Sequence, residues 1–145
     1  MMTDRHQIRW MGRADVVDVL RIDRLSFSPW MDEAELVALT KQRDVITCVA
    51  ETQQMTDGFM IYRLLPGVLE LLRIAVLPSE RKRGIGTQMV ERLKSKLAQQ
   101  NRRELIVRVP EKNLGAQLFF SRCGMIGFQS GNDVVFSYYA KDADL

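Results

Sequence analysis

One short basic segment holds the residue types best suited to chemistry in this chain. It consists of three cations, two glycines and two neighbouring residues: Arg81, Lys82, Arg83, Gly84, Ile85, Gly86 and Thr87. An apolar run, 71–76, precedes the segment, and a helix-patterned stretch, 87–99, follows it. The first amides of a helix lack intrahelical partners and carry the positive end of its dipole. Glycines let such amides approach an anion closely, so the segment predicts a phosphate-binding turn. The alternative is a solvated basic turn capped by glycine.

Two common phosphate-binding motifs do not fit this segment. A P-loop places its lysine after the glycines, whereas Lys82 precedes both of them. A dinucleotide-binding fingerprint has a third glycine at the position where this chain has Met89. What remains is the pattern Arg-x-x-Gly-x-Gly, which begins at Arg81.

This pattern resembles the coenzyme A pyrophosphate loop of the GCN5-related N-acetyltransferase (GNAT) family. Three more segments match in the family's order. Residues 74–76 are similar to its fourth strand, and 113–124, "NLGAQLFFSRCG", to its last helix. Residues 26–30 are similar to the "SFxxPW" segment of ribosomal-protein alanine N-acetyltransferases and their relatives. Together the matches span about residues 7–140.

The resemblance implies an α/β fold, with a mixed central sheet of about six to seven strands and about four helices on both faces. It implies one N-acetyltransferase domain over residues 1–145 and acetyl-CoA as the cosubstrate. Asn113 would contact the cofactor arm, although it reads equally well as a plain helix N-cap. The residues that the resemblance assigns to acetyl-CoA are Ile74, Ala75, Val76, Arg81, Lys82, Arg83, Gly84, Ile85, Gly86, Thr87, Asn113 and Phe120.

The catalytic positions depart from the family's pattern. Its last helix usually offers a tyrosine as proton donor to the thiolate, and the matching residue here is Phe120. The fifth strand often carries Glu or His, and here that position is Arg108, which is not a base at any ordinary pH. Glu70 remains as a carboxylate on the fourth strand. It either relays a proton through water, with a pKa raised by burial, or pairs with Arg108 across the cleft.

Aromatic residues predict the walls of an acceptor groove suited to an extended peptide N-terminus. The resemblance places Phe27, Pro29 and Trp30 on one wall and Tyr138 and Tyr139 near the other. Core packing is the alternative, which we favour for Phe27 but not for Trp30. Three functions stay open: acetylation of a protein N-terminal amine, acetylation of a small amine, and a coenzyme A-binding module that has lost catalysis.

Composition is typical of a globular domain. The chain has 145 residues, 46% of them hydrophobic and 27% charged, and its net charge of +3 is too small to indicate nucleic acid. Cys48 and Cys123 are expected to be reduced core thiols, and no metal is expected. The N-terminus lacks the apolar core of a signal peptide, and no apolar run approaches the ~18 residues of a membrane span. We therefore expect a cytoplasmic monomer or homodimer.

Hydrophobic periodicity predicts the elements that position these residues. Strands are expected at 8–11, 45–51, 58–64, 69–76, 105–109 and 134–139, with another around Phe128. Helices are expected at 15–25, 32–41, 86–99 and 113–124. The strands that precede the last two helices must lie side by side to form the cofactor cleft.

Overall fold

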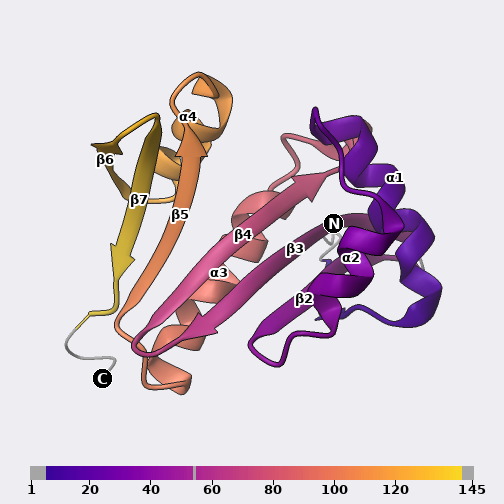
Figure 1. The fold of residues 1–145 in the computed structure, drawn as a ribbon, viewed down its shortest axis with the longest axis horizontal. Helices are drawn as coiled ribbons and strands as arrows, with labels where there is room; N and C mark the ends of the chain where they lie inside the picture. The colour runs from indigo at the N-terminus through magenta and orange to yellow at the C-terminus, as the bar shows by residue number, and fades with distance from the viewer. Residues whose placement is uncertain (1–5, 54, 142–145) are drawn as a thin grey trace, which may run out of the picture. The chain divides into compact units, whose positions relative to one another are not determined.

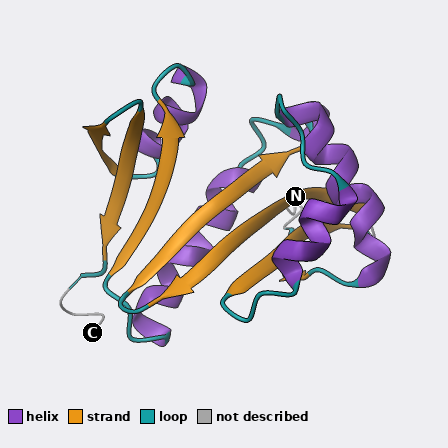
Figure 2. Cartoon of the chain, viewed as in Figure 1, coloured by secondary structure: helices purple, strands orange, loops and turns teal. Residues whose placement is uncertain are grey.

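The computed structural model describes residues 6–53 and 55–141 (Figure 1). Its strands are β1 (Gln7–Trp10), β2 (Val45–Thr52), β3 (Met55–Leu65), β4 (Val68–Val76), β5 (Glu104–Pro110), β6 (Ile126–Ser130) and β7 (Asp133–Tyr139). Its helices are α1 (Val16–Ser26), α2 (Glu33–Thr40), α3 (Ile85–Gln99) and α4 (Leu114–Arg122), and two 3-10 turns are η1 (Arg13–Asp15) and η2 (Pro78–Glu80). The predicted α/β class, with a seven-stranded mixed sheet and four helices in the described residues, is confirmed (Figure 2).

The strands are hydrogen-bonded in the order β1-β2-β3-β4-β5-β7-β6. β5 pairs with β7 and β7 with β6, both antiparallel, and β1 pairs antiparallel with β2. β4 and β5 are parallel, with paired residues from Val68 and Glu104 to Leu71 and Val107. The expectation that the strands preceding the last two helices lie side by side is therefore confirmed.

The chain forms two compact units. The first contains the described residues up to Tyr62 together with Arg73–Met89, and the second contains Arg63–Leu72 and the described residues from Val90 onward. In the first unit, α2 lies in front of β2 and β3 in Figure 1, and α3 begins behind β4. The basic segment 81–87 therefore belongs to the first unit, whereas Glu70, Arg108 and Phe120 belong to the second.

The core of the first unit is built from an apolar stripe on α1 and from β3, which is buried on both faces. Val19 and Ile22 of α1 are fully buried, and so are three consecutive residues of β3. Gly58 lies where β3 passes closest to its neighbours. A Cβ there would stand 3.0 Å from the carbonyl oxygen of Ala75 and 3.2 Å from Cε of Met89. Only glycine allows this close packing of β3 against β4 and the start of α3.

The second unit packs α3 and α4 on one face of its strands. Along β5, Leu105, Val107 and Val109 are buried and the residues between them are more exposed, as the predicted alternation requires. The ring of Phe120 on α4 lies 5.9 Å from the ring of Phe136 on β7. Phe120 therefore anchors α4 to the sheet.

The helix ends lie within one or two residues of the predicted ones. Asp32 accepts from the amide of Glu35 at 2.8 Å and Glu35 accepts in return, which forms a capping box. α3 begins at Ile85, before the expected Gly86, because the Ile85 side chain is buried and continues the helical face. α4 ends at Arg122, two residues before the expected end.

The described part of the chain contains no helix that is long and apolar enough to cross a membrane.

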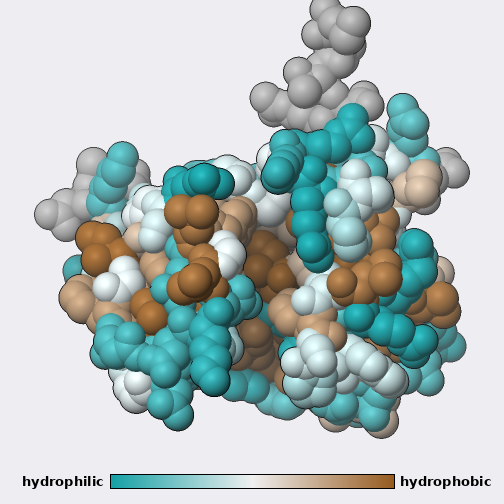
Figure 3. Space-filling model, turned by 90° about the horizontal axis from the view of Figure 1, so that it is seen from above, coloured by the Kyte–Doolittle hydropathy of each residue, from teal (hydrophilic) through white to brown (hydrophobic). Residues whose placement is uncertain are grey.

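The face drawn in Figure 3 shows hydrophobic residues interspersed with hydrophilic ones. Cys48 and Cys123 are both buried, as expected of core thiols.

Candidate active site

Segment 81–87, called the cofactor loop below, leads from η2 into α3. Gly84 has a positive φ of 83°, a left-handed conformation that suits glycine, and Lys82 has a φ of 68°. The amide of Gln88 donates to the carbonyl oxygen of Gly84 at 2.9 Å and so makes the first bond of the helix. The amides of the preceding turn have no intrahelical acceptor. They stand at the positive end of a 15-residue helix.

The space around Gly84 is open. A Cβ at this residue would meet no atom within 4 Å, and the residues from Arg81 to Gly84 are all exposed. An open turn with free amides at a helix N-terminus is the arrangement that binds phosphate groups. The residues present therefore fit the pyrophosphate of a coenzyme A molecule.

The cations of the cofactor loop have different surroundings. Arg81 donates from Nε to the carbonyl oxygen of Val76 at 3.1 Å and from a terminal nitrogen to Oγ of Ser26 at 3.2 Å. Arg83 pairs with Glu80 at 2.8 Å, with its own side chain 64% exposed. Because such an exposed pair contributes little, Arg83 can exchange Glu80 for an anionic ligand at small cost. Arg81, in contrast, links β4 to α1.

Glu70 and Arg108 lie on the same face of two parallel strands. Nε of Arg108 stands 3.5 Å from Oε2 of Glu70, and their side chains are 55% and 17% exposed. The register explains this, because Glu70 is paired with Ile106 and Arg108 follows two residues later on the same face. The prediction that the two residues lie within salt-bridge reach is confirmed.

Polar groups continue on this face toward β7. Ser137 donates from Oγ to a carboxylate oxygen of Glu104 at 2.9 Å. Tyr139 is paired with Glu104 in the register, and the negative charge of that carboxylate raises the pKa of the tyrosine. The face that carries Glu70 and Arg108 therefore has polar side chains on three strands, with Ile106 between Glu70 and Ser137.

The two residues of α4 assigned to the cofactor have clear structural roles. Asn113 accepts from the amide of Ala116 at 3.1 Å, so the N-cap reading is correct. Phe120 is only 3% exposed, and its ring lies 5.0 Å from that of Phe119. It carries no ionisable proton and cannot replace the tyrosine of the family's pattern.

The residues predicted as one wall of the acceptor groove, Phe27, Pro29 and Trp30, lie in the connection 27–31 between α1 and α2. We call it the acceptor segment. Phe27 is half-buried, and the guanidinium of Arg73 lies 4.2 Å from the centre of its ring. Trp30 is 47% exposed, with Arg24 at 4.6 Å from its ring, and Pro29 is exposed. Pro29 and Trp30 are thus available to a ligand, and Phe27 is packed from one side.

The two tyrosines predicted for the other wall point in opposite directions, because they are successive residues of one strand. Tyr138 lies on the helix-covered face, where Nζ of Lys94 stands 4.6 Å from its ring centre. Tyr139 is 65% exposed and shares the face of Glu70 and Arg108.

Sequence reasoning missed Asp23 and Arg73, which form a partly buried ion pair, with the Arg73 side chain 27% exposed. Nε of Arg73 donates to Oδ1 of Asp23 at 2.5 Å, and the Asp23 side chain has no exposed surface. A signal for Asp23 exists, because it lies on the face of α1 that carries Val19 and Ile22. A carboxylate on an apolar helix face requires a partner.

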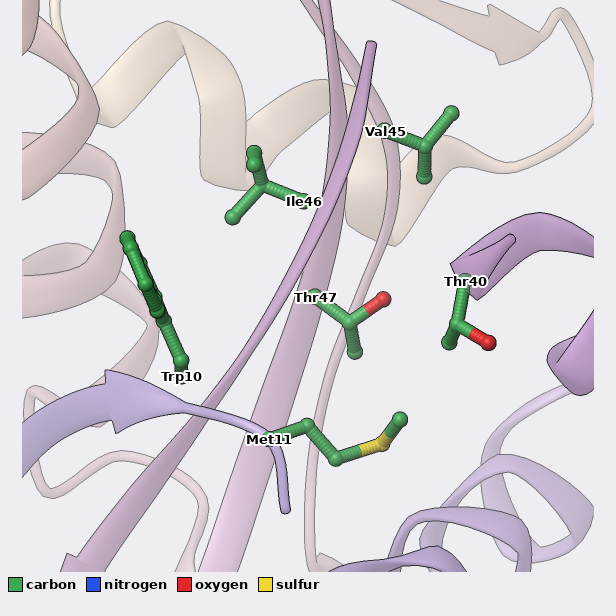
Figure 4. Close-up of a pocket in the computed structure, with 6 residues that line it drawn as sticks. All are labelled: Trp10, Met11, Thr40, Val45, Ile46 and Thr47. Atoms are coloured by element: carbon green, nitrogen blue, oxygen red, sulfur yellow. The ribbon is translucent and has the colours of Figure 1, made fainter. Parts of the chain in front are cut away.

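A separate pocket of about 250 Å³ contains none of the predicted site residues. Figure 4 shows the residues that line it, Trp10, Met11, Thr40, Val45, Ile46 and Thr47. Elsewhere in residues 6–53 and 55–141, no three His, Cys, Asp or Glu side chains come together as a metal site.

Comparison with protein families identifies one match. Residues 16–125 match the sequence model described as the acetyltransferase (GNAT) family. This match covers most of the chain and includes the cofactor loop, Asp23, Glu70 and α4. A comparison with curated proteins gave no match.

Solved structures share the fold at low sequence identity. The ribosomal-protein-S18-alanine N-acetyltransferase of Escherichia coli has a TM-score of 0.80 at 15% identity, over 94% of both chains. Ard1 from Thermoplasma volcanium has a TM-score of 0.83 at 17% identity, over 95% of this chain and 99% of that one. The PaiA N-acetyltransferase of Thermoplasma acidophilum, solved with coenzyme A, has a TM-score of 0.74 at 15% identity, over 92% and 98%.

Proposed function

Because the chain belongs to the GNAT family and is an N-acetyltransferase, we propose that it transfers acetyl from acetyl-CoA to the α-amine of a protein or peptide N-terminus. The observation that carries the cofactor half of this proposal is the open glycine turn at the start of α3. The exposed Pro29 and Trp30 support the acceptor half, since an apolar surface with an aromatic edge suits an extended peptide. The E. coli structural relative, which acetylates a ribosomal protein at alanine, supports the same acceptor class.

The residues that would hold acetyl-CoA are those of the cofactor loop and the end of β4. The amides of the first turn of α3 would bind the pyrophosphate, and Lys82 and Arg83 would add positive charge. Backbone groups of Ile74, Ala75 and Val76 would hold the pantetheine arm. Acetyl-CoA supplies a thioester whose carbonyl carbon accepts the amine.

Glu70 is the carboxylate that we propose as the proton acceptor for the incoming ammonium group. It lies on β4, four residues before Ile74, and keeps 17% of its side chain exposed, so that water can reach it. Relay of a proton through one water is sufficient for general base catalysis. Arg108 lies beside this carboxylate, with its Nε 3.5 Å from Oε2 of Glu70. The buried Phe120 offers no proton, so we propose that the thiolate is protonated from solvent.

A coenzyme A-binding protein without transfer activity is the second candidate, and one observation favours it. The position that matches the family's tyrosine is a buried phenylalanine, as the ring contacts of Phe120 show. Proximity of amine and thioester nevertheless lowers the barrier by ~7–11 kcal/mol without any acid, so transfer does not depend on that hydroxyl.

The test measures acetyl-CoA binding by calorimetry and then the release of free thiol with a panel of amines. The panel contains peptides with free N-termini, the same peptides blocked at the N-terminus, and small polyamines. Thiol release only with the free peptides supports the proposal. Thiol release only with polyamines would show that the acceptor is a small amine. Tight binding of acetyl-CoA without thiol release in the presence of any amine would support the second candidate.

A further inference from the structure

Asp23 is a charged residue on the buried face of α1. Its carboxylate faces Arg73 of β4, with Oδ1 at 2.5 Å from Nε and Oδ2 at 3.3 Å from a terminal nitrogen. Replacing a buried ion pair by apolar residues of similar size is often neutral or stabilising. Packing alone therefore does not explain why this helix face carries a charge.

Asp23 contacts both ends of the acceptor segment. Its backbone carbonyl accepts from the amide of Phe27 at 2.9 Å, and its Oδ2 accepts from the amide of Met31 at 2.5 Å. Met31 is 3% exposed and directly precedes Asp32, the N-cap of α2. The bond to Phe27 is a backbone helical bond, so the Asp23 side chain itself fixes where this five-residue connection ends, at Met31.

Arg73 extends the same set of contacts to β4. Its guanidinium lies against the ring of Phe27, and the residue directly precedes Ile74. A second link joins the same end of α1 to the cofactor loop, because Ser26 accepts a hydrogen bond from Arg81. The contacts of Arg73 with Asp23 and Phe27 therefore attach the segment that carries the exposed Pro29 and Trp30 to β4.

We propose that Asp23 is a positioning residue that, together with Arg73, holds the acceptor segment in register with the strand assigned to acetyl-CoA. This inference rests on the proposed function. A surface that is fixed before binding avoids the entropy cost of ordering a loop, and a fixed surface keeps the amine near the thioester. Loss of the pair should weaken acceptor binding and leave acetyl-CoA binding intact.

The main variant is Asp23→Leu/Arg73→Met, which removes both charges and leaves no unpaired ion in the core. The matched control is Asp18→Asn/Arg21→Gln. It removes an ion pair from the same helix, but one whose side chains are 41% and 52% exposed. Both variants are compared with the unaltered chain for thermal unfolding and acetyl-CoA affinity. They are also compared for kcat and KM with a peptide that has a free amino-terminal alanine.

The main variant should fold and bind acetyl-CoA within about twofold of the unaltered chain. Its KM for the peptide should rise by about tenfold, a change expected from the loss of one charge-assisted hydrogen bond. The control variant should change neither the affinity for acetyl-CoA nor the KM for the peptide. A folded main variant with an unchanged KM for the peptide would overturn the proposal.

Hydrogen exchange tests the same inference without turnover. In the unaltered chain, the amide of Met31 should exchange slowly, and it should lose protection in the main variant. The amide of Phe27 keeps its backbone acceptor at residue 23 and serves as the internal reference. If that variant does not fold, Asp23→Ala/Arg73→Gln replaces it, because alanine offers Met31 no side-chain acceptor and no charge is left unpaired. Unchanged protection of the Met31 amide in this variant would contradict the positioning role. If the unaltered enzyme does not acetylate the peptide, the proposed acceptor is wrong. Amide hydrogen exchange is then the measurement that tests the role of Asp23.

Discussion

Nε of Arg108 lies 3.5 Å from Oε2 of Glu70, across two parallel strands. The pair is asymmetric, because the Glu70 side chain is 17% exposed and that of Arg108 is 55% exposed. The side chain of Arg108 can therefore change rotamer toward solvent or toward an acidic group of an acceptor. The less exposed side chain of Glu70 has less freedom to move. Glu70 is therefore the better candidate for accepting a proton. Arg108 is the better candidate for a residue that acts through its contact with the Glu70 carboxylate.

Glu70→Gln should reduce kcat by about 100-fold or more, because general base catalysis contributes ~10²–10⁴-fold. Acetyl-CoA affinity should remain within a factor of about two, since the substitution is remote from the cofactor loop in sequence. Steady-state kinetics and calorimetry give both values. Glu104→Gln is the matched control, because Glu104 also lies on this face of the sheet and bonds to Ser137. Equal losses of kcat in the two variants would argue against a specific role for Glu70.

Arg108→Ala separates the two uses of the arginine. As a partly exposed ion pair, the contact should contribute less than about 1 kcal/mol to the free energy of unfolding. If Arg108 holds an acidic group of the acceptor, the loss of activity should be confined to acidic peptides. A loss shared equally by acidic and neutral peptides would instead show that Arg108 acts through Glu70.

Gly84→Ala should weaken acetyl-CoA binding more than it weakens the fold. The new Cβ meets no protein atom, but it stands in the open space beside the helix amides, and the left-handed φ adds ~1 kcal/mol of strain. Gly67→Ala is a close control, since Gly67 has a φ of 71° and open surroundings in the turn that precedes β4. Both variants should lose similar stability in chemical denaturation. Equal acetyl-CoA affinity in the two would show that the glycine turn does not bind the cofactor.

Phe120→Tyr should destabilise the fold rather than simply restore an acid. The ring is 3% exposed and lies against Phe119 and Phe136, so a hydroxyl there needs a partner that the apolar surroundings do not supply. An unpaired buried hydroxyl costs ~1–3 kcal/mol, which thermal or chemical unfolding will detect. Unchanged stability combined with a higher kcat would show instead that the hydroxyl reaches the reacting thiol.

Acid should weaken the N-terminal part of the fold through Asp15. Arg9 donates to Asp15 at 2.8 and 2.9 Å and also bonds to Glu51, and its hydrogen bond lowers the pKa of Asp15 below the ordinary value of 3.8. Because the folded-state pKa is the lower one, the stabilisation is complete above pH 3.8 and is lost as the pH falls toward the folded value.

Denaturation of the native chain and Asp15→Asn between pH 5 and 2.5 measures this contribution. The two free energies of unfolding should differ by about 1–3 kcal/mol at the upper end, as expected for hydrogen bonds to a charged group. The difference should shrink toward the lower end. Parallel curves over the whole range would mean that Asp15 does not titrate differently in the folded state.

Local patterns in the sequence were sufficient to predict the helices and strands and part of the candidate site. The Asp32 capping box, the alternation along β5 and the glycine turn at Gly84 each depend on residues close together in the chain. The Glu70–Arg108 contact was predictable because the family resemblance supplied the neighbouring strands.

Contacts between distant segments were not predictable in this way. Asp23 and Arg73 are 50 residues apart, and nothing in either segment specifies the other. The bond from Arg81 to Ser26 likewise depends on how α1 packs against β4, which is decided by the whole core. These long-range ion pairs and hydrogen bonds hold the acceptor segment, so the sequence identified its aromatic residues but not what fixes them.

The most direct test of the proposed function uses one peptide that carries both a free N-terminal α-amine and an internal lysine. The peptide is incubated with the enzyme and acetyl-CoA, and tandem mass spectrometry locates the added acetyl group. The account predicts acetyl on the α-amine, with the lysine unmodified, and no product from Gly84→Ala at limiting acetyl-CoA. Acetyl on the lysine alone, or an unmodified peptide despite bound acetyl-CoA, would contradict it.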